Sequence, residues 1–236
     1  MCYNLIGGFM DKNDYYKAYD SRYKQIHDLG KLWEFEEPTK EVLDFLEDYN
    51  KGDSVLELGC GEGRDAINLL NKGYNLLATD YSKEAINKCN ELSNNQYIKN
   101  FKTLDFLTEE LNNKYDYIYS ISVLHMLVLK EHRIKYLKFI KDHLKENGKA
   151  LITVLGDGSF NKCTNIEDAF NIVERKYQNT DEVVNVPETS CNIVGWNTLE
   201  EEIKKAGLLL NKKWISKDIP GFNLSMCVIV SKNNNN

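Results

Sequence analysis

Short apolar runs alternate with helix-like stretches over the middle of the sequence, and this alternation constrains the fold most. The strand-like runs are residues 54–58, 75–79, 97–103, 115–120 and 149–155. Helical spacing follows the first run at 65–71 and the fourth at 132–144, and Ser82 is a good N-cap for a helix after the second run. Strands that alternate with helices form βαβ units, so the sequence predicts a parallel sheet.

The last two strand-like runs follow a different pattern. Residues 208–216 and 224–231 are joined by a turn that contains Pro220-Gly221, and no helix fits between them. We therefore expect these runs to pair as an antiparallel hairpin. For the whole chain the prediction is an α/β fold, a Rossmann-like mixed sheet of seven strands with helices on both faces and a C-terminal antiparallel hairpin.

Two longer segments lie outside this alternation. Residues 1–50 form a predicted N-terminal helical extension, or lid, with two candidate helices. Residues 51–232 form the main domain, which carries an insertion at 156–195 with a candidate short helix near 166–175. Because ligands bind at the carboxyl ends of the strands in open α/β sheets, we expect this insertion to contact the substrate. The polar tail, 233–236, is predicted to be disordered.

Composition argues against several classes of function. The 236 residues carry a net charge of −6, and lysine and arginine are scattered rather than clustered, which argues against nucleic acid as a partner. The six cysteines form no CxxC pair, so we expect no metal site and a reduced, cytoplasmic protein. The sequence has no signal-peptide pattern and no apolar run of about 20 residues that could span a membrane.

The glycine-rich run after the first strand carries the strongest functional signal. It reads Glu57-Leu58-Gly59-Cys60-Gly61-Glu62-Gly63-Arg64 and opens a helix. Glycines let the backbone approach a ligand closely, and the first N–H groups of the helix are free to face it. A dinucleotide site favours GxGxxG, whereas this run is GxGxG followed by Arg64. The acidic Glu57 suits a ligand with a positive amino group, such as the methionine part of S-adenosylmethionine (SAM).

An acidic residue at the end of the second strand supports this interpretation. Asp80 lies about 20 residues beyond the glycine loop, where a carboxylate can accept hydrogen bonds from both ribose hydroxyls of a nucleoside. The next residue, Tyr81, could lie against an adenine ring. Together the glycine loop and Asp80 predict a site for a ligand that contains adenosine.

With these motifs, the chain resembles the class I SAM-dependent methyltransferases, specifically the small-molecule group that includes the thiopurine and tellurite-resistance types. Three stretches carry the resemblance: Gly61-Glu62-Gly63-Arg64-Asp65-Ala66, Asp80-Tyr81-Ser82 and Ser120-Ile121-Ser122-Val123-Leu124-His125-Met126-Leu127. It covers residues 50–155 well and 196–210 loosely. The resemblance implies the class I methyltransferase fold, SAM as cofactor and a small-molecule methyl acceptor.

The resemblance also implies which residues bind SAM. In chain order they are Glu57, Gly59, Cys60, Gly61, Gly63, Arg64, Asp80, Tyr81, Asp105, Phe106, Ser120 and Ile121. Glu57 and the glycine loop would hold the methionine part, and Asp80 would bind the ribose. Asp105 would meet the adenine amino group, and the carbonyls of Ser120 and Ile121 would face the methionine ammonium.

The best candidate for a catalytic side chain is His125, which follows the fourth strand. Methyl transfer from a sulfonium is an in-line displacement, so the protein mainly positions a nucleophile and excludes water. A general base is needed only for some acceptors. His125 is therefore either that base or a structural histidine in a loop.

Candidate substrate contacts come from the extension and the insertion; they are Tyr15, Tyr16, Trp33 and Asp157. The three aromatic residues could form a lid over the cofactor or acceptor. Asp157 could orient an amine, although a plain turn explains Gly156-Asp157-Gly158 as well. Tyr19 and Tyr23 lie at helical spacing from Tyr15, and we expect them to pack inside the fold.

The sequence thus predicts a SAM-dependent methyltransferase that acts on an O, N or S nucleophile of a small molecule. Enzymes that methylate amines of bases carry an Asn/Asp/Ser-Pro-Pro-Tyr/Phe motif after the fourth strand, and this chain has Ser120-Ile121-Ser122-Val123 there. Two alternatives stay open. One is an NAD-dependent oxidoreductase, which the GxGxG loop and the hairpin disfavour, and the other is a non-catalytic SAM-binding sensor or partner subunit.

Overall fold

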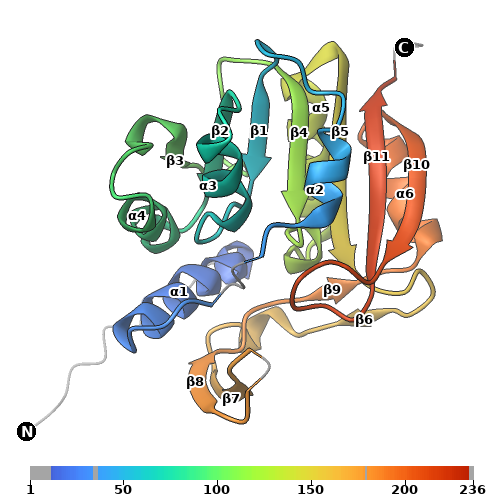
Figure 1. The fold of residues 1–236 in the computed structure, drawn as a ribbon. Helices are drawn as coiled ribbons and strands as arrows, with labels where there is room; N and C mark the ends of the chain where they lie inside the picture. The colour runs from blue at the N-terminus through green and yellow to red at the C-terminus, as the bar shows by residue number, and fades with distance from the viewer. Residues whose placement is uncertain (1–11, 34–36, 179, 234–236) are drawn as a thin grey trace, which may run out of the picture.

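The structure is a computed structural model that describes residues 12–33, 37–178 and 180–233, and a seven-stranded sheet forms its centre (Figure 1). The strand order is β10-β11-β5-β4-β1-β2-β3, and these strands span Leu208–Ser216, Ser225–Lys232, Leu144–Leu155, Tyr115–Ile121, Val55–Leu58, Leu76–Asp80 and Phe101–Thr103. Neighbours from β5 to β3 are parallel, whereas β11 is antiparallel to both β5 and β10. The predicted mixed sheet and its C-terminal hairpin are confirmed.

Helices cover both faces of the sheet because the central strands are apolar on both sides. All four residues of β1 are buried, and consecutive residues point to opposite faces. On one face an apolar cluster joins β1 to α5 (Lys130–His143) and α6 (Trp196–Lys205). On the other face a second cluster joins it to α2 (Lys40–Phe45), α3 (Arg64–Asn71) and α4 (Lys83–Leu92). Ser82 caps α4 as predicted, since its hydroxyl accepts the N–H of Ala85.

The insertion differs from the sequence prediction. Instead of a helix near 166–175, a single 3-10 turn η4 (Ile166–Asp168) leads into β7 (Ile172–Lys176), which pairs with β8 (Val183–Pro187). Two short strands, β6 (Lys162–Cys163) and β9 (Asn192–Ile193), pair at its base. The predicted helix is wrong because Val184 and Val186, which alternate along β8, bury one face of the β7–β8 hairpin against Ile26.

Two smaller boundaries also differ. The third strand is shorter than expected, because Ile98–Asn100 form the 3-10 turn η2 before β3. The fifth strand is longer, since β5 begins at Leu144, directly after α5. No helix within the described ranges is long and apolar enough to cross a membrane.

The N-terminal extension is helical within its described residues, and its helix α1 (Ala18–Asp28) lies across the carboxyl ends of β1 and β2 (Figure 1). It contains the 3-10 helix η1 (Lys12–Lys17), α1 and α2. On the sheet side, the Ser82 hydroxyl donates to the Asp20 carboxylate at 2.6 Å. On the insertion side, the Tyr19 hydroxyl donates to the Ser190 carbonyl at 2.7 Å. The extension thus joins the sheet to the insertion; residues 1–11 and 34–36 of it, and 234–236 of the tail, lie outside the described residues.

One buried ion pair connects the helices of one face to the loop after β4. The Arg133 guanidinium is 1% exposed and donates two hydrogen bonds of 2.8 Å to the Glu202 carboxylate. It also donates to the carbonyl of Leu124, which precedes His125. α5, α6 and this loop therefore share one buried cation.

We expect Glu202→Ala to lower the free energy of unfolding by about 3–5 kcal/mol, because it leaves the Arg133 cation buried without its carboxylate. Urea denaturation followed by circular dichroism measures the change. Glu201→Ala, one residue away on the exposed face of α6, is the matched control and should change it by about 0.5 kcal/mol or less. Equal losses in the two variants would contradict this role of the pair.

Candidate functional site

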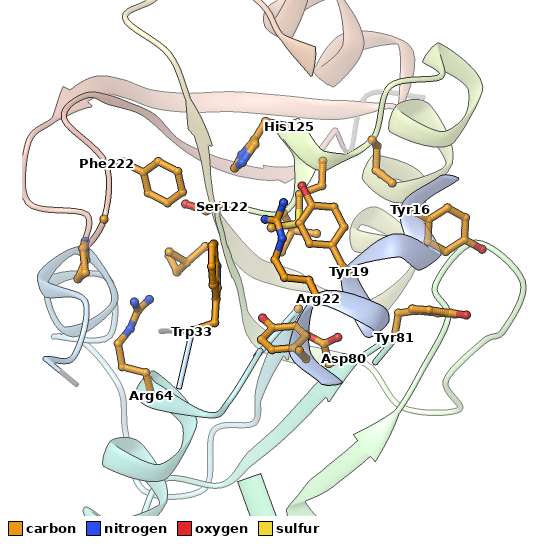
Figure 2. Close-up of a pocket in the computed structure, with 18 of the residues that line it drawn as sticks. Tyr16, Tyr19, Arg22, Trp33, Arg64, Asp80, Tyr81, Ser122, His125 and Phe222 are labelled. Carbon is orange, nitrogen blue, oxygen red and sulfur yellow. The ribbon is translucent and has the colours of Figure 1, made fainter. Parts of the chain in front are cut away.

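A cavity of about 670 Å³ opens at the carboxyl ends of β1, β2 and β4 (Figure 2). This is the place where ligands bind in open α/β sheets. Its walls come from seven parts of the chain: the glycine loop, the end of β2, the loop after β3, the end of β4, the N-terminal extension, the end of β7 in the insertion, and the loop between β10 and β11. The volume lies within the range of about 300–1,000 Å³ that is usual for small-molecule sites.

The glycine loop forms the part of the wall between β1 and α3. Gly59 has φ +73°, and a Cβ there would lie 2.3 Å from Cγ2 of Val123 in the loop after β4, so only glycine fits. Gly63 has φ +86° and precedes the first residue of α3. The N–H groups of Gly59 and Cys60 donate to the Thr79 carbonyl, which fixes the loop against the end of β2.

Asp80 ends β2, and the loops around it hold its carboxylate in place. The Gly61 N–H donates to Oδ2 and the Ser82 N–H to Oδ1, both at 2.8 Å. Burial raises the pKa of Asp80 to about 6, and the nearby Asp20 carboxylate adds to the rise. Each oxygen keeps a lone pair for a further donor, and the side chain lines the cavity beside Tyr81. The arrangement suits a ligand with two adjacent hydroxyls.

The loop after β4 brings Ser122 into the cavity wall in an unusual conformation. Ser122 has φ +60°, a left-handed value that is uncommon for a residue with a side chain. Its N–H donates to the carbonyl and the hydroxyl oxygen of Thr153 on β5. Its own Oγ is buried, and no described residue satisfies it. A strained residue with an unsatisfied hydroxyl at a cavity wall is typical of a ligand contact.

His125 also lines the cavity, and its hydrogen bonding fixes what it can do. The ring is 5% exposed and contacts Phe222 edge to face, with 5.7 Å between ring centroids. The Leu155 N–H donates to Nδ1 at 3.3 Å, so the neutral ring carries its proton on Nε2. Burial, with the Arg133 cation, lowers the pKa of His125 to about 3. A neutral imidazole with its free proton on Nε2 is a hydrogen-bond donor, which disfavours the predicted base role.

The N-terminal extension supplies one side of the cavity. Tyr16, Tyr19, Arg22, Tyr23 and Trp33 line it, and Figure 2 shows Arg22 and Trp33 close together in its centre. The Tyr16 hydroxyl donates to the Asp105 carboxylate at 2.8 Å, which ties η1 to the loop after β3. Tyr19 and Tyr23, expected from the sequence to pack inside the fold, thus face the cavity.

Tyr15, which was predicted to contact the substrate, packs inside the protein instead. Its ring is buried, and its hydroxyl accepts the N–H groups of Val128 and Leu129 at 2.9 and 3.2 Å. It lies outside the cavity wall because residues 12–17 form a 3-10 helix, whose side chains repeat every three residues rather than every 3.6. The face of the extension therefore rotates between η1 and α1.

The structure brings nine of the predicted site residues to the cavity: Gly59, Arg64, Asp80, Tyr81, Phe106, Ile121, His125, Tyr16 and Trp33. Eight others are not among the lining residues: Glu57, Cys60, Gly61, Gly63, Asp105, Ser120, Tyr15 and Asp157. Glu57 accepts the Tyr119 hydroxyl at 2.8 Å, and the Ser120 hydroxyl donates to the Leu58 carbonyl. Asp157 accepts the N–H groups of Ser159 and Phe160 in an exposed turn, which is the plain-turn alternative.

Other residues of the wall were not predicted. Arg175, Lys176 and Gln178 enter from the end of β7, and Phe222 enters from the loop between β10 and β11. The first three residues were missed because a helix was expected at 166–175, where the structure has β7. The turn signal Pro220-Gly221 marked the second loop, but nothing in the sequence showed that it reaches the cavity. Ser122 lies within the motif after the fourth strand, but no local signal marked it as a residue of the cavity wall.

Comparisons with known proteins agree with this geometry. Residues 56–150 match a family described as "Methyltransferase domain". The chain is 30% identical over 99 residues to the probable SAM-dependent methyltransferase TehB of Haemophilus influenzae, and 30% identical over 117 residues to tRNA (carboxymethyluridine(34)-5-O)-methyltransferase alkbh8 of Xenopus tropicalis. These matches cover 42% and 50% of this chain but only 34% and 18% of the two relatives.

A solved structure shows the same fold over nearly the whole chain. The 1,6-didemethyltoxoflavin-N1-methyltransferase of Burkholderia thailandensis superposes with a TM-score of 0.68 at 16% identity, and the match covers 98% of this chain and 94% of that one. The fold is therefore that of the class I methyltransferases. Residues 56–150 are therefore similar to the methyltransferase domain, and the chain shares its fold with solved SAM-dependent methyltransferases.

We expect SAM affinity to fall as the pH drops below about 6, because Asp80 is then protonated and loses a charge-assisted acceptor for the ribose hydroxyls. Asp80→Asn should weaken SAM binding by about 1–3 kcal/mol near pH 7.5 and remove this pH dependence. Calorimetric titration between pH 5 and 8 measures both effects. Asp142→Asn, on the exposed side of α5, is the control. A wild-type pH dependence that persists in Asp80→Asn would rule out this residue as its source.

Proposed function

We propose that the protein transfers a methyl group from SAM to an O, N or S nucleophile of a small molecule held in the same cavity. One observation carries the proposal: the cavity continues from the cofactor-type residues Gly59 and Asp80 to a separate wall of Arg22, Trp33 and Phe222. A protein that only bound SAM would need the first wall alone. The second wall supports an acceptor site next to the methyl donor.

The residues of the first wall fit SAM. Gly59 lets the glycine loop pass close to Val123 at the cavity wall, and Asp80 offers two carboxylate oxygens that are fixed in position. The ring of Tyr81 lines the cavity beside Asp80, Phe106 lines it as well, and both could contact adenine. When bound there, SAM supplies an activated methyl group on a sulfonium. The protein then has to position the acceptor and exclude water.

Ser122 and His125 are placed to position the acceptor. Both follow β4 and line the cavity, and each has a donor that the described residues leave unused: the Ser122 hydroxyl and the His125 Nε2–H. A neutral hydroxyl or thiol that accepts one of these hydrogen bonds keeps its second lone pair for the methyl group, whereas a neutral amine would donate to the Ser122 Oγ and keep its single lone pair. The proton that it loses after transfer goes to solvent, since the low pKa of His125 makes it a poor base.

The extension and the insertion favour a small acceptor over a macromolecule. α1 covers the carboxyl ends of the strands and is held from both sides, by Ser82 through Asp20 and by Ser190 through Tyr19. An acceptor that enters beneath it has to be small enough for a cavity of about 670 Å³. The named acceptor of the Xenopus relative is a tRNA uridine, so the shared domain alone does not determine the acceptor.

The test is a screen of small hydroxyl, amine and thiol compounds with SAM that carries a deuterated methyl group. We expect at least one compound to gain the label with equimolar S-adenosylhomocysteine. On that acceptor, His125→Asn should keep more activity than His125→Ala, because asparagine retains an N–H donor. If the pH profile of the wild-type activity has an inflection between 5 and 8, both variants should keep it.

Two outcomes would contradict the proposal. Tight SAM binding without any labelled product across a broad screen would favour the non-catalytic sensor or partner subunit. A wild-type pH inflection that disappears in both His125 variants would restore the general-base role. Lys99→Gln, an exposed change beside β3, is the control for protein quality.

A further inference from the structure

The acceptor wall of the cavity carries positive charge that the described part of the chain leaves uncompensated. Four cationic side chains line the cavity, Arg22, Arg64, Arg175 and Lys176, against the single carboxylate of Asp80. The chain as a whole has a net charge of −6, so this local excess runs against its composition. An excess of one sign inside a concave site attracts ligands of the other sign.

Two of the four cations are neutralised by neighbours. The Arg64 guanidinium lies 3.2 Å from the Asp65 carboxylate, and the Lys176 ammonium lies 2.8 Å from Asp181. Among the described residues, arginine ion pairs form only at Arg64 and Arg133. Arg22 and Arg175 therefore form no ion pair with any carboxylate of the described residues.

Arg22 is the more constrained of the two. It is 7% exposed, and its guanidinium donates only to neutral oxygens: the carbonyls of Pro187 and Glu188 and the hydroxyl of Thr189. Its Nε is buried and has no partner among the described residues. The guanidinium lies over the ring of Trp33, 4.9 Å from its centroid. A buried cation without a carboxylate is costly, so such an arrangement is typical of an anion site.

Arg175 lies on the same side of the cavity. Its guanidinium donates to the Glu188 carbonyl, which also accepts a hydrogen bond from Arg22. The two cations therefore meet at one backbone oxygen, and the charge of Arg175 adds to the effect of burial that lowers the pKa of Arg22 to about 10. Two guanidinium groups side by side repel each other until an anion lies between them.

We propose that the methyl acceptor is a flat, ring-containing small molecule with an anionic oxygen group, a carboxylate or a phosphate, bound by Arg22 and Arg175. The inference rests on the proposed function and adds the acceptor's class. The rings of Trp33 and Phe222 line the same cavity and offer apolar surface to the acceptor ring, while the nucleophile points toward Ser122 and His125. Arginine forks match both carboxylate and phosphate oxygens, so both groups fit the two guanidiniums.

The test uses 4-hydroxybenzoate and the uncharged 4-hydroxybenzamide, titrated calorimetrically into the full chain saturated with S-adenosylhomocysteine. We expect the carboxylate to bind at least about tenfold more tightly than the amide. Arg175→Gln should reduce this preference to about threefold or less, and Arg175→Lys should keep most of it. Lys114→Gln, at the opposite end of β4, is the matched control and should keep all of it.

Equal binding of the two compounds, binding of neither, or a preference that survives Arg175→Gln would overturn the inference. The prior titration with S-adenosylhomocysteine separates this failure from a failure of the proposed function. If the cofactor product does not bind, the proposed function fails as well. If it binds but no anion preference appears, only the acceptor class is wrong. Phenyl phosphate in place of 4-hydroxybenzoate shows which anionic group the arginines favour.

Discussion

The site depends on a close approach between two loops that allows no side chain at Gly59. The turn after β1 passes so near Val123 that a Cβ would lie 2.3 Å from its methyl group. The same turn is held to β2 by hydrogen bonds to Thr79 and to the Asp80 carboxylate. One glycine thus brings the ends of three neighbouring strands, β1, β2 and β4, to the wall of a single cavity. The position of the cavity, and of the acid that faces it, follows from this contact.

The second constraint is that one helix closes the site from two sides. α1 holds the insertion through Arg22, which donates to two carbonyls and a hydroxyl there. At the other side, His27 and the N–H of Trp33 contact the Glu62 carboxylate in the glycine loop, at 2.7 and 3.0 Å. The glycine loop, the extension and the insertion are therefore mechanically coupled. A ligand that displaces one of them also changes the acceptor wall.

The sequence was sufficient for the parts of the fold in which local pattern and packing agree. The alternation of strands and helices, the terminal hairpin, the Ser82 cap and the place of Asp80 could all be predicted, because each depends on residues within one or two turns of the chain. The hairpin β7–β8 could not, since its pairing depends on how Val184 and Val186 pack against Ile26 in a distant helix. The tertiary packing of this hairpin outweighs the local helical pattern of residues 166–175.

The functional residues divide in the same way. Asp80 and Gly59 follow from a motif, whereas Ser122, Arg175 and Phe222 reach the cavity only through tertiary structure. Tyr15 and Tyr19 exchanged their expected roles because a 3-10 helix shifts the face of the extension before α1 begins. Glu57 was predicted to hold the methionine part of SAM, but its side chain accepts a hydrogen bond from Tyr119 inside the protein and does not line the cavity. A sequence motif therefore predicts where a loop lies in the fold more reliably than it predicts which of its side chains face the cavity.

The central claim is that one cavity holds the cofactor and leaves room for an acceptor beside it. A crystal structure with S-adenosylhomocysteine tests this most directly. We expect the ribose hydroxyls at Asp80, the sulfur directed toward the loop after β4, and an open space between Arg22, Trp33 and Phe222. A ligand that fills this space, or one that binds away from Asp80, would contradict the account.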